Sequence, residues 1–240
     1  MCRVLAYLGS PIPLENLLYK PDSSLLKQAY RPKMLEMLNL AGFGMMAWDS
    51  TSYVPDVPYR YVTTELPIFD ANLRNLSAKL RPYSVLAHVR GVPYHDQVHV
   101  NLQNLHPFHY EGASVALAHN GDLANFNSYK FSLLEHVRPE FRTKIRGSTD
   151  SELIYALLLS HLEDPGGRTH FDELLKALEG TLCMLRKVRL QEGVTRSSST
   201  NLFVMNGDML LATRFTFDFG CYGDHINKDT LRYLSQWFTV

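Results

Sequence analysis

A cysteine occupies the second position of the chain, directly after the initiator methionine. Removal of Met1 leaves a thiol and a free α-amine on the same residue. The reference pKa of an α-amine is about 7.7–8.0 and that of a thiol about 8.5, so the amine of Cys2 is partly unprotonated at neutral pH. It can then accept the thiol proton, which is a known way to activate an N-terminal nucleophile. The alternative is a cysteine placed there by chance, and only other motifs can decide against it.

A second motif, His119-Asn120-Gly121-Asp122, follows an apolar run. An acyl-transfer reaction needs two hydrogen-bond donors aimed at the developing oxyanion. The Asn120 carboxamide and the Gly121 amide can supply both, because a glycine lets the backbone approach a substrate closely. The alternative is an ordinary Asn-Gly turn, which is the commoner meaning of this dipeptide.

Two charged residues could hold parts of a substrate that do not react. Arg90 follows an apolar run, and a guanidinium binds a carboxylate through two parallel hydrogen bonds. Asp150 lies within a capping-box signature, in which we expect Glu152 to reach back to the Thr149 cap, and its carboxylate could bind an ammonium group. The alternatives are a surface charge and a plain helix cap. With a thiol and two oxyanion donors, these groups fit an α-amino acid that carries a distal acyl group.

The elements that must position these groups follow from apolar periodicity and turn residues. Strands are predicted over Cys2–Leu8, Phe43–Trp48, Tyr59–Thr64, Ser84–Arg90 and Ala113–His119, followed by a hairpin of Leu202–Met205 and Met209–Ala212. Helices or helical turns are predicted over Leu14–Tyr19, Ser24–Tyr30, Asp70–Leu80, Ser128–His136, Thr149–Leu162 and Phe171–Arg189. This order is too irregular for a doubly wound parallel sheet. We therefore predict an α+β fold with antiparallel sheets and helices packed against them.

Composition narrows the class of protein. The 240 residues are 45% hydrophobic and 20% charged, and no linker divides them, so we expect one globular domain over residues 1–240. Lys plus Arg and Asp plus Glu both number 24, which lacks the basic excess of a nucleic-acid binder. A mild basic cluster at Arg138, Arg142, Lys144 and Arg146 is either a binding patch or, as we expect, a solvated face.

The cysteines and the apolar runs indicate the compartment. Three cysteines, an odd number, argue against a disulfide framework. The apolar run near the N-terminus is too short for a signal peptide, and no later run approaches a membrane span. We expect a cytoplasmic protein. Cys183 is predicted to pack in the core from an apolar helix, and Cys221 to lie in a loop.

A metal site is an alternative that the histidines raise. Several of them fall between residues 88 and 119: His88, His95, His99, His106, His109 and His119. His95 and His99 are four residues apart, but no cysteine pair or His-Glu-X-X-His pattern completes a site. We therefore expect neither a metal nor another cofactor.

The motifs, taken in order, resemble those of the class II glutamine amidotransferases, a family of N-terminal-nucleophile hydrolases. The matching segments are Met1-Cys2-Arg3, Ala87-His88-Val89-Arg90, Asn104-Leu105-His106-Pro107-Phe108, His119-Asn120-Gly121 and Thr149-Asp150-Ser151-Glu152. The resemblance implies a four-layer αββα sandwich and hydrolysis of a γ-glutamyl amide through a thioester on Cys2, with release of glutamate. It also implies that Asn120 and Gly121 form the oxyanion hole, that Arg90 and Asp150 bind the substrate carboxylate and ammonium, and that His106 shapes the pocket.

Two further segments, Met1–Gly9 and Pro21–Leu26, are similar to the ergothioneine-pathway γ-glutamyl amidohydrolase and to the fungal amidotransferase subunit that degrades glutathione. Related chains usually have an aspartate at the position of Ala41, and often a hydroxyl residue after the arginine, where Gly91 stands here. These departures leave the substrate open among glutamine, glutathione and larger γ-glutamyl conjugates. Relatives usually run past Val240, which indicates that terminal strands are missing from this sequence.

Two other functions remain as alternatives. The chain could be an ammonia-supplying glutaminase subunit that works with a partner synthase, since no synthase domain is attached. It could also be a non-catalytic binding module on the same fold, although Cys2, Asn120 and Asp150 are all present. We expect a small-molecule γ-glutamyl substrate, no nucleic acid and no membrane. A homo-oligomer, or a synthase or peptidase partner, stays open.

Overall fold

The described strands form two four-stranded sheets in which the paired strands run antiparallel. The computed structural model describes residues 2–32, 38–92 and 100–217. The first sheet contains β1 (Arg3–Leu8), β2 (Phe43–Trp48), β3 (Tyr59–Thr63) and β4 (Ser84–Val89), in the order β1-β4-β2-β3. The second contains β5 (Ala116–Asp122), β6 (Ser198–Met205) and β7 (Leu210–Ala212) in that order, with β8 (Thr216–Phe217) also paired to β6.

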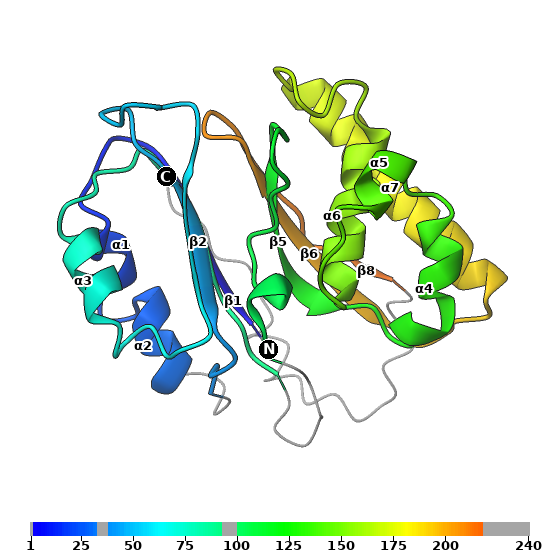
Figure 1. Ribbon diagram of the computed structural model, residues 1–240. Coiled ribbons are helices and arrows are strands. Elements are labelled where there is room, and N and C mark those ends of the chain that lie inside the picture. Colours follow the sequence, from blue (N-terminus) through cyan, green and yellow to red (C-terminus); the bar gives the residue numbers. More distant parts are fainter. Residues whose placement is uncertain (1, 33–37, 93–99, 218–240) are drawn as a thin grey trace.

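Helices cover the outer faces of both sheets (Figure 1). The first sheet is covered by α1 (Glu15–Leu18), α2 (Leu25–Tyr30) and α3 (Ala71–Ser77). The second is covered by α4 (Phe126–Leu134), α5 (Pro139–Arg142), α6 (Asp150–His161) and α7 (Phe171–Gln191), and a short 3₁₀ helix, η1, spans Leu102–Asn104. The layers are helix, sheet, sheet, helix, which confirms the predicted αββα sandwich.

Strand alternation divides the core into three layers, because successive side chains of a strand point to opposite faces. On β4, Val85 and Ala87 pack against α1–α3, whereas Leu86 packs between the two sheets. On β5, Leu117 packs with α4–α7, whereas Ala116 and Ala118 face the first sheet. Both faces of β2 and β4 are therefore buried, which explains why their sequences are continuously apolar.

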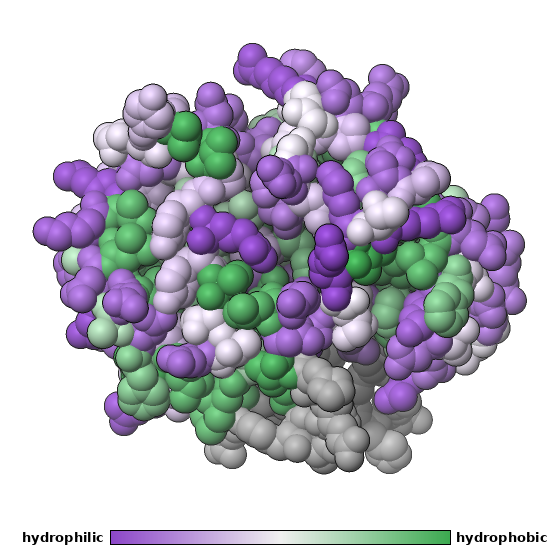
Figure 2. All heavy atoms as spheres, in the orientation of Figure 1, coloured by the Kyte–Doolittle hydropathy of each residue, from purple (hydrophilic) through white to green (hydrophobic). Residues whose placement is uncertain are grey.

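The outer helices present hydrophilic side chains to solvent. In the face shown in Figure 2, hydrophilic residues predominate over α4–α7, with isolated hydrophobic ones among them. The long helix α7 buries one stripe that includes Leu174, Leu178, Leu185 and Val188 at spacings of three, four or seven residues. Cys183 lies off this stripe and is exposed, so the prediction that it packs in the core is wrong.

Two local predictions need correction. The strand predicted over Ala113–His119 begins at Ala116 and continues through Asp122, because Asn120 and Gly121 pair with β6. The capping box at α6 is only half formed. Thr149 accepts from the Glu152 amide (3.3 Å), as predicted, but the Glu152 carboxylate accepts from the amides of Arg146 (2.9 Å) and Gly147 (2.6 Å). Glu152 therefore fixes the loop before the helix rather than the cap itself.

Candidate active site

The pairing of β1 with β4 brings Cys2 to Arg90. Arg3 lies opposite Val89 and Val4 opposite His88, so the next pair in this register is Cys2 and Arg90. The Cys2 sulfur accepts from the Gly91 amide (3.4 Å) and lies 3.6 Å from the Gly91 carbonyl oxygen. The predicted nucleophile and the predicted carboxylate-binding cation are thus neighbours across two strands.

The thiol of Cys2 is in a setting that disfavours its ionisation. Burial raises its pKa above the usual value, while the hydrogen bond from Gly91 and the charge of Arg90 act in the opposite direction. The net pKa is raised. A thiolate would therefore form only with help from a base, which fits a mechanism that uses the adjacent α-amine.

Arg90 is 7% exposed, and its backbone is fixed by the segment before β2. The Arg90 amide donates to the Gly42 carbonyl (2.8 Å), and the Ala41 amide donates to the Arg90 carbonyl (3.1 Å). Burial lowers the pKa of the guanidinium, and the charges of Cys2 and Asp150 oppose this effect. Ala41 and Gly91 thus contact Arg90 and Cys2, respectively, through their backbones.

Asn120 and Gly121 lie inside β5 and not in a turn, so the alternative of an Asn-Gly turn is wrong. Asn120 shares a face of β5 with Ala116 and Ala118, which line the layer between the sheets. Cys2 lies just before β1 and two residues before Val4, so its side chain points to the same face as that of Val4, which packs into that layer. Both side chains are therefore directed to the space between the sheets.

The backbone of Gly121 is oriented for donation away from its partner strand. Thr200, opposite Gly121, turns its own backbone groups toward the other side of β6: its amide donates to Phe215 (2.7 Å) and its carbonyl accepts from the Thr213 hydroxyl (3.4 Å). Thr200 and Gly121 are therefore a non-hydrogen-bonded pair, in which the backbone N–H and C=O groups of both residues point away from the partner strand. The Gly121 N–H thus points away from β6. A Cβ at Gly121 would lie 1.8 Å from the Ser199 carbonyl oxygen, so only glycine fits.

Asp150 begins α6 and is held by three donors. Its carboxylate accepts from the amides of Leu123 (2.7 Å) and Ser151 (2.7 Å) and from the Ser151 hydroxyl (3.1 Å). Its charge acts on the pKa of both Cys2 and Arg90, which places it within electrostatic reach of them. The structure therefore gathers these charged and nucleophilic groups at one end of the sandwich.

Residues to which the sequence motifs gave no role of their own hold the segment around Asp150 in place. The buried Asn104 side chain accepts from the Ser148 amide (2.9 Å) and donates to the Ser148 hydroxyl (3.2 Å). The His119 ring contacts the Ser151 hydroxyl (2.9 Å) and the Ser199 carbonyl (3.2 Å). Because a carbonyl only accepts, the His119 nitrogen facing Ser199 carries the hydrogen. His119 thus joins β5 to the start of α6.

His106 lies in a group of buried aromatic rings within electrostatic reach of Arg90. Its ring centroid is 4.1 Å from that of His88 and 4.7 Å from that of Phe108. Burial and the nearby charge of Arg90 lower the pKa of His106 well below its usual value, and that of His88 to about 3. Both imidazoles are therefore neutral, which fits a residue that shapes the pocket and does not act as a base.

Neither a metal site nor a binding role for the basic cluster is evident in the described residues. His95 and His99 lie outside them, as does Cys221, and within them no group of three or more His, Cys, Asp or Glu residues could hold a metal ion. None of the helices in the described ranges combines the length and the apolarity needed to cross a membrane.

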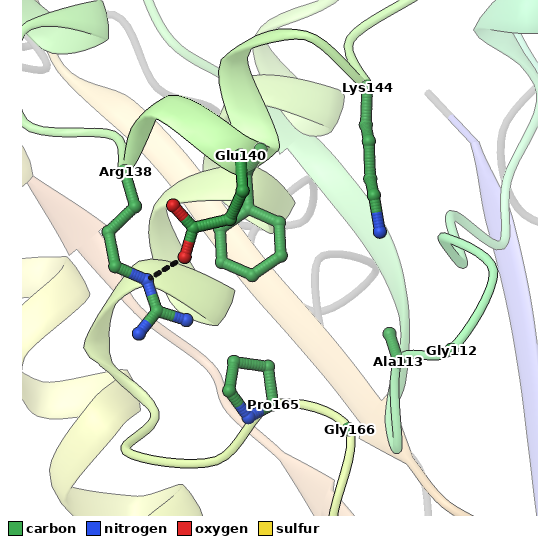
Figure 3. A pocket seen from close by; sticks show the side chains of 8 residues that line it. Gly112, Ala113, Arg138, Glu140, Lys144, Pro165 and Gly166 are labelled. Carbon is green, nitrogen blue, oxygen red and sulfur yellow. Dashed lines mark ion pairs between the residues drawn. The ribbon is translucent and has the colours of Figure 1, made fainter.

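The basic cluster forms part of a small pocket beside α5, whose lining includes Arg138, Glu140 and Lys144 (Figure 3). Arg138 pairs with Glu140 (3.0 Å) and donates to two carbonyls at the end of α6, while Arg142 donates to two carbonyls after α4. Lys144 donates to the Glu111 carbonyl (3.2 Å). These three side chains thus hydrogen-bond to backbone carbonyls of neighbouring segments. None of the predicted site residues lines the pocket.

Comparison with known proteins decides the family. The family profile described as "Glutamine amidotransferases class-II" matches residues 42–217. The chain belongs to the class II glutamine amidotransferases. It is also 30% identical, over 232 residues, to the probable glutamine amidotransferase DUG3 of Saccharomyces cerevisiae, an alignment that covers 90% of this chain and 64% of the yeast protein. The chain thus spans somewhat less than two thirds of the length of that curated relative.

Solved structures support the fold. A glutamine aminotransferase class-II domain protein from Silicibacter pomeroyi has a TM-score of 0.61 at 22% identity, covering 91% of this chain and 78% of that one. The allosteric regulatory enzyme of purine biosynthesis has a TM-score of 0.50 at 17% identity, covering 89% of this chain and 37% of that one. The predictions of family and of fold are confirmed.

The neutral histidines predict how stability depends on pH. An unfolded His88 has a pKa of about 6.5, so below that pH the unfolded chain binds a proton that the native state, with a pKa of about 3, does not bind. The free energy of unfolding should therefore fall as the pH decreases from 6.5, by up to about 1.4 kcal/mol per pH unit for each such histidine. His88→Gln should lose stability less steeply between pH 6.5 and 5, as measured by urea unfolding. His170→Gln, at an exposed histidine, is the control; parallel curves for His88→Gln and the parent would contradict the assignment.

Proposed function

We propose that this chain hydrolyses a γ-glutamyl amide bond, with Cys2 as an N-terminal nucleophile. One observation carries the proposal: Cys2 lies beside Gly91 and Arg90 at the end of the layer between the sheets. The side chain of Asn120 is directed toward the same layer. Asp150 acts electrostatically on the same two groups. Hydrolysis of the distal amide of an α-amino acid requires a cation for the carboxylate, an anion for the ammonium, two donors for the oxyanion and a thiol as nucleophile.

The reaction follows from these positions. Once Met1 is removed, the α-amine of Cys2 accepts the thiol proton, and the sulfur attacks the γ-carbonyl carbon. Asn120 and the Gly121 N–H donate to the oxyanion of the tetrahedral intermediate. Its collapse breaks the C–N bond, and the leaving amine takes the proton from the α-amine. A water molecule then attacks the thioester and restores the thiol as glutamate leaves.

The residues that hold the reacting centre differ from those that hold the rest of the substrate. Arg90 binds the α-carboxylate as a two-pronged contact, and Asp150 binds the α-ammonium. The buried neutral rings of His88 and His106 pack against each other within electrostatic reach of Arg90. Recognition is therefore assigned to the γ-glutamyl half of the substrate. A panel of glutamine, glutathione and longer γ-glutamyl amides, assayed for glutamate release, identifies the leaving group.

The first prediction concerns the N-terminus. With Met1 retained, the nitrogen of Cys2 is an amide that cannot accept a proton at neutral pH, so the active protein should begin at Cys2. Intact-mass measurement should show the loss of one methionine. A non-cleavable N-terminal tag should abolish turnover and leave the fold intact, as judged by circular dichroism. Normal turnover by the tagged protein would refute this mechanism.

Labelling tests the nucleophile separately. A γ-glutamyl diazo-ketone should modify Cys2 and spare Cys183, although Cys183 is the more exposed of the two. Iodoacetamide, which needs no binding site, is the control and should modify Cys183. Cys2→Ser should retain little activity, because a hydroxyl loses its proton far less readily than a thiol. Peptide mapping that finds the diazo-ketone on Cys183 alone would exclude Cys2.

The oxyanion hole is tested by Asn120→Ala. Stabilisation of an oxyanion acts only in the transition state, so kcat should fall by about 10²–10³-fold while KM changes little. Steady-state kinetics of glutamate release provide the measurement. A near-normal kcat would remove Asn120 from the mechanism.

The ammonium contact is tested by Asp150→Asn with two matched substrates. A hydrogen bond to a charged group contributes about 1.5–3 kcal/mol, so kcat/KM for a substrate with a free α-amine should fall about 10–100-fold more than for its N-acetyl analogue. The comparison cancels the loss that arises because the amide no longer accepts from both Leu123 and Ser151. Arg90→Lys should also impair both substrates, since a point charge cannot replace the planar fork. Equal losses on the two substrates would count against Asp150.

A further inference from the structure

Asn201 on β6 lies directly opposite Asn120 on β5. Its side-chain nitrogen is 3.0 Å from the Asn120 carbonyl oxygen and 3.2 Å from the Ser199 hydroxyl oxygen. Residues directly opposite each other in an antiparallel pair project to the same face of the sheet, so Asn201 shares with Asn120 the face that is turned toward the first sheet. It is half-buried there, among the groups of the candidate active site.

The orientation of the Asn201 carboxamide follows from its partner. A backbone carbonyl can only accept, so the atom that faces Asn120 must be the nitrogen. The second hydrogen of the same nitrogen is directed at Ser199, which lies on the same strand face two residues away. These two contacts fix the nitrogen end of the side chain: one joins it to Asn120 on β5, and the other joins it to Ser199 on its own strand.

The carbonyl of Asn120 and the N–H of Gly121 belong to one peptide group. A peptide group is planar, so a bond that fixes the direction of the carbonyl also fixes the direction of the N–H. A donor on the carbonyl also polarises the peptide and strengthens the N–H as a donor in turn. The contact from Asn201 therefore reaches the oxyanion through the backbone, without touching the substrate.

Gly121 itself contributes no side chain that could hold this peptide. The Ser199 carbonyl leaves no room for a side chain at this position, so no side chain of residue 121 can restrict the backbone. Glycine has more conformational freedom than any other residue. The N–H of Gly121 points away from β6, so it takes no part in the ladder itself. The neighbouring pair, Asn120 and Asn201, is then of the hydrogen-bonded kind, and the Asn201 side chain adds a second donor to a carbonyl that the ladder already engages.

We infer that Asn201 is a positioning residue for the oxyanion hole: its side chain fixes the peptide between Asn120 and Gly121 so that the Gly121 N–H is directed at the reacting carbonyl. The inference rests on the proposed function, because it assigns a role within the same site. It also extends the site to β6, from which the proposed mechanism takes no residue.

The test compares Asn201→Ala with Asn120→Ala and with a matched control. Asn206→Ala makes the same chemical change at the end of the same strand, where Asn206 accepts from the amides of Asp208 (3.1 Å) and Met209 (2.9 Å). Each variant is assayed for kcat and KM of glutamate release, for inhibition by the product glutamate, and for thermal unfolding. Loss of one neutral hydrogen bond predicts a kcat for Asn201→Ala about 2–10-fold lower, with KM and glutamate inhibition unchanged within about twofold. Asn206→Ala should lower stability and leave kcat unchanged.

A second variant keeps the shape of the side chain. Asn201→Asp places an oxygen against the Asn120 carbonyl, so kcat should fall at least as far as in Asn201→Ala, and this variant replaces Asn201→Ala if the latter does not fold. A normal kcat in whichever of the two folds overturns the inference. A loss of kcat that appears equally in Asn206→Ala also overturns it, because the effect would then follow stability alone. If Asn120→Ala lowers kcat but the Asn201 variants do not, only this inference fails; if Asn120→Ala keeps its kcat, the proposed mechanism fails as well.

Discussion

The site depends on the antiparallel pairing of β1 with β4. This pairing sets Arg3 opposite Val89, and it therefore brings Cys2 against Gly91 at the end of the two strands. A slip of one residue would turn every side chain of β1 to the opposite face and would move the thiol out of the inter-sheet layer. The continuous burial of β4 and the packing of Leu5 and Val4 on opposite faces of β1 oppose such a slip. Core packing thus fixes the position of the nucleophile.

A second set of bonds couples the helical layer to the same end of the sandwich. Asp150 accepts from the Leu123 amide just after β5, and His119 contacts Ser151 from within β5. Glu152 and Asn104 fix the loop that precedes α6. Because these bonds join β5 to the start of α6, the strand that carries Asn120 and the carboxylate of Asp150 are held as one unit. Displacement of α6 along its axis would disturb both at once.

Much of this arrangement was predictable from sequence, and the exceptions have physical causes. The strand over Phe43–Trp48 rests on a local apolar pattern that the structure confirms. The motifs also singled out Cys2 and Arg90, and strand register makes these two residues neighbours. Asn201 could not be found, because its partner is about 80 residues away and the contact depends on strand register. The exposure of Cys183 follows from its angular position on α7, which composition alone does not show. The Glu152 carboxylate accepts from two backbone amides of the preceding loop, which the capping-box motif does not predict.

The neutrality of the buried histidines bears on the electrostatics around Arg90. His88 and His106 are neutral, and with Phe108 they form a cluster of uncharged rings near Arg90. Charge interactions are stronger where water is excluded, so the guanidinium and the oxyanion donors act over a low-dielectric background. A protonated imidazole at His88 would instead place a second cation beside Arg90, where it would compete for the carboxylate of the proposed substrate. With these rings neutral, Arg90 is the cation that the proposed mechanism assigns to the carboxylate, and its position then sets where the γ-carbonyl would meet Cys2.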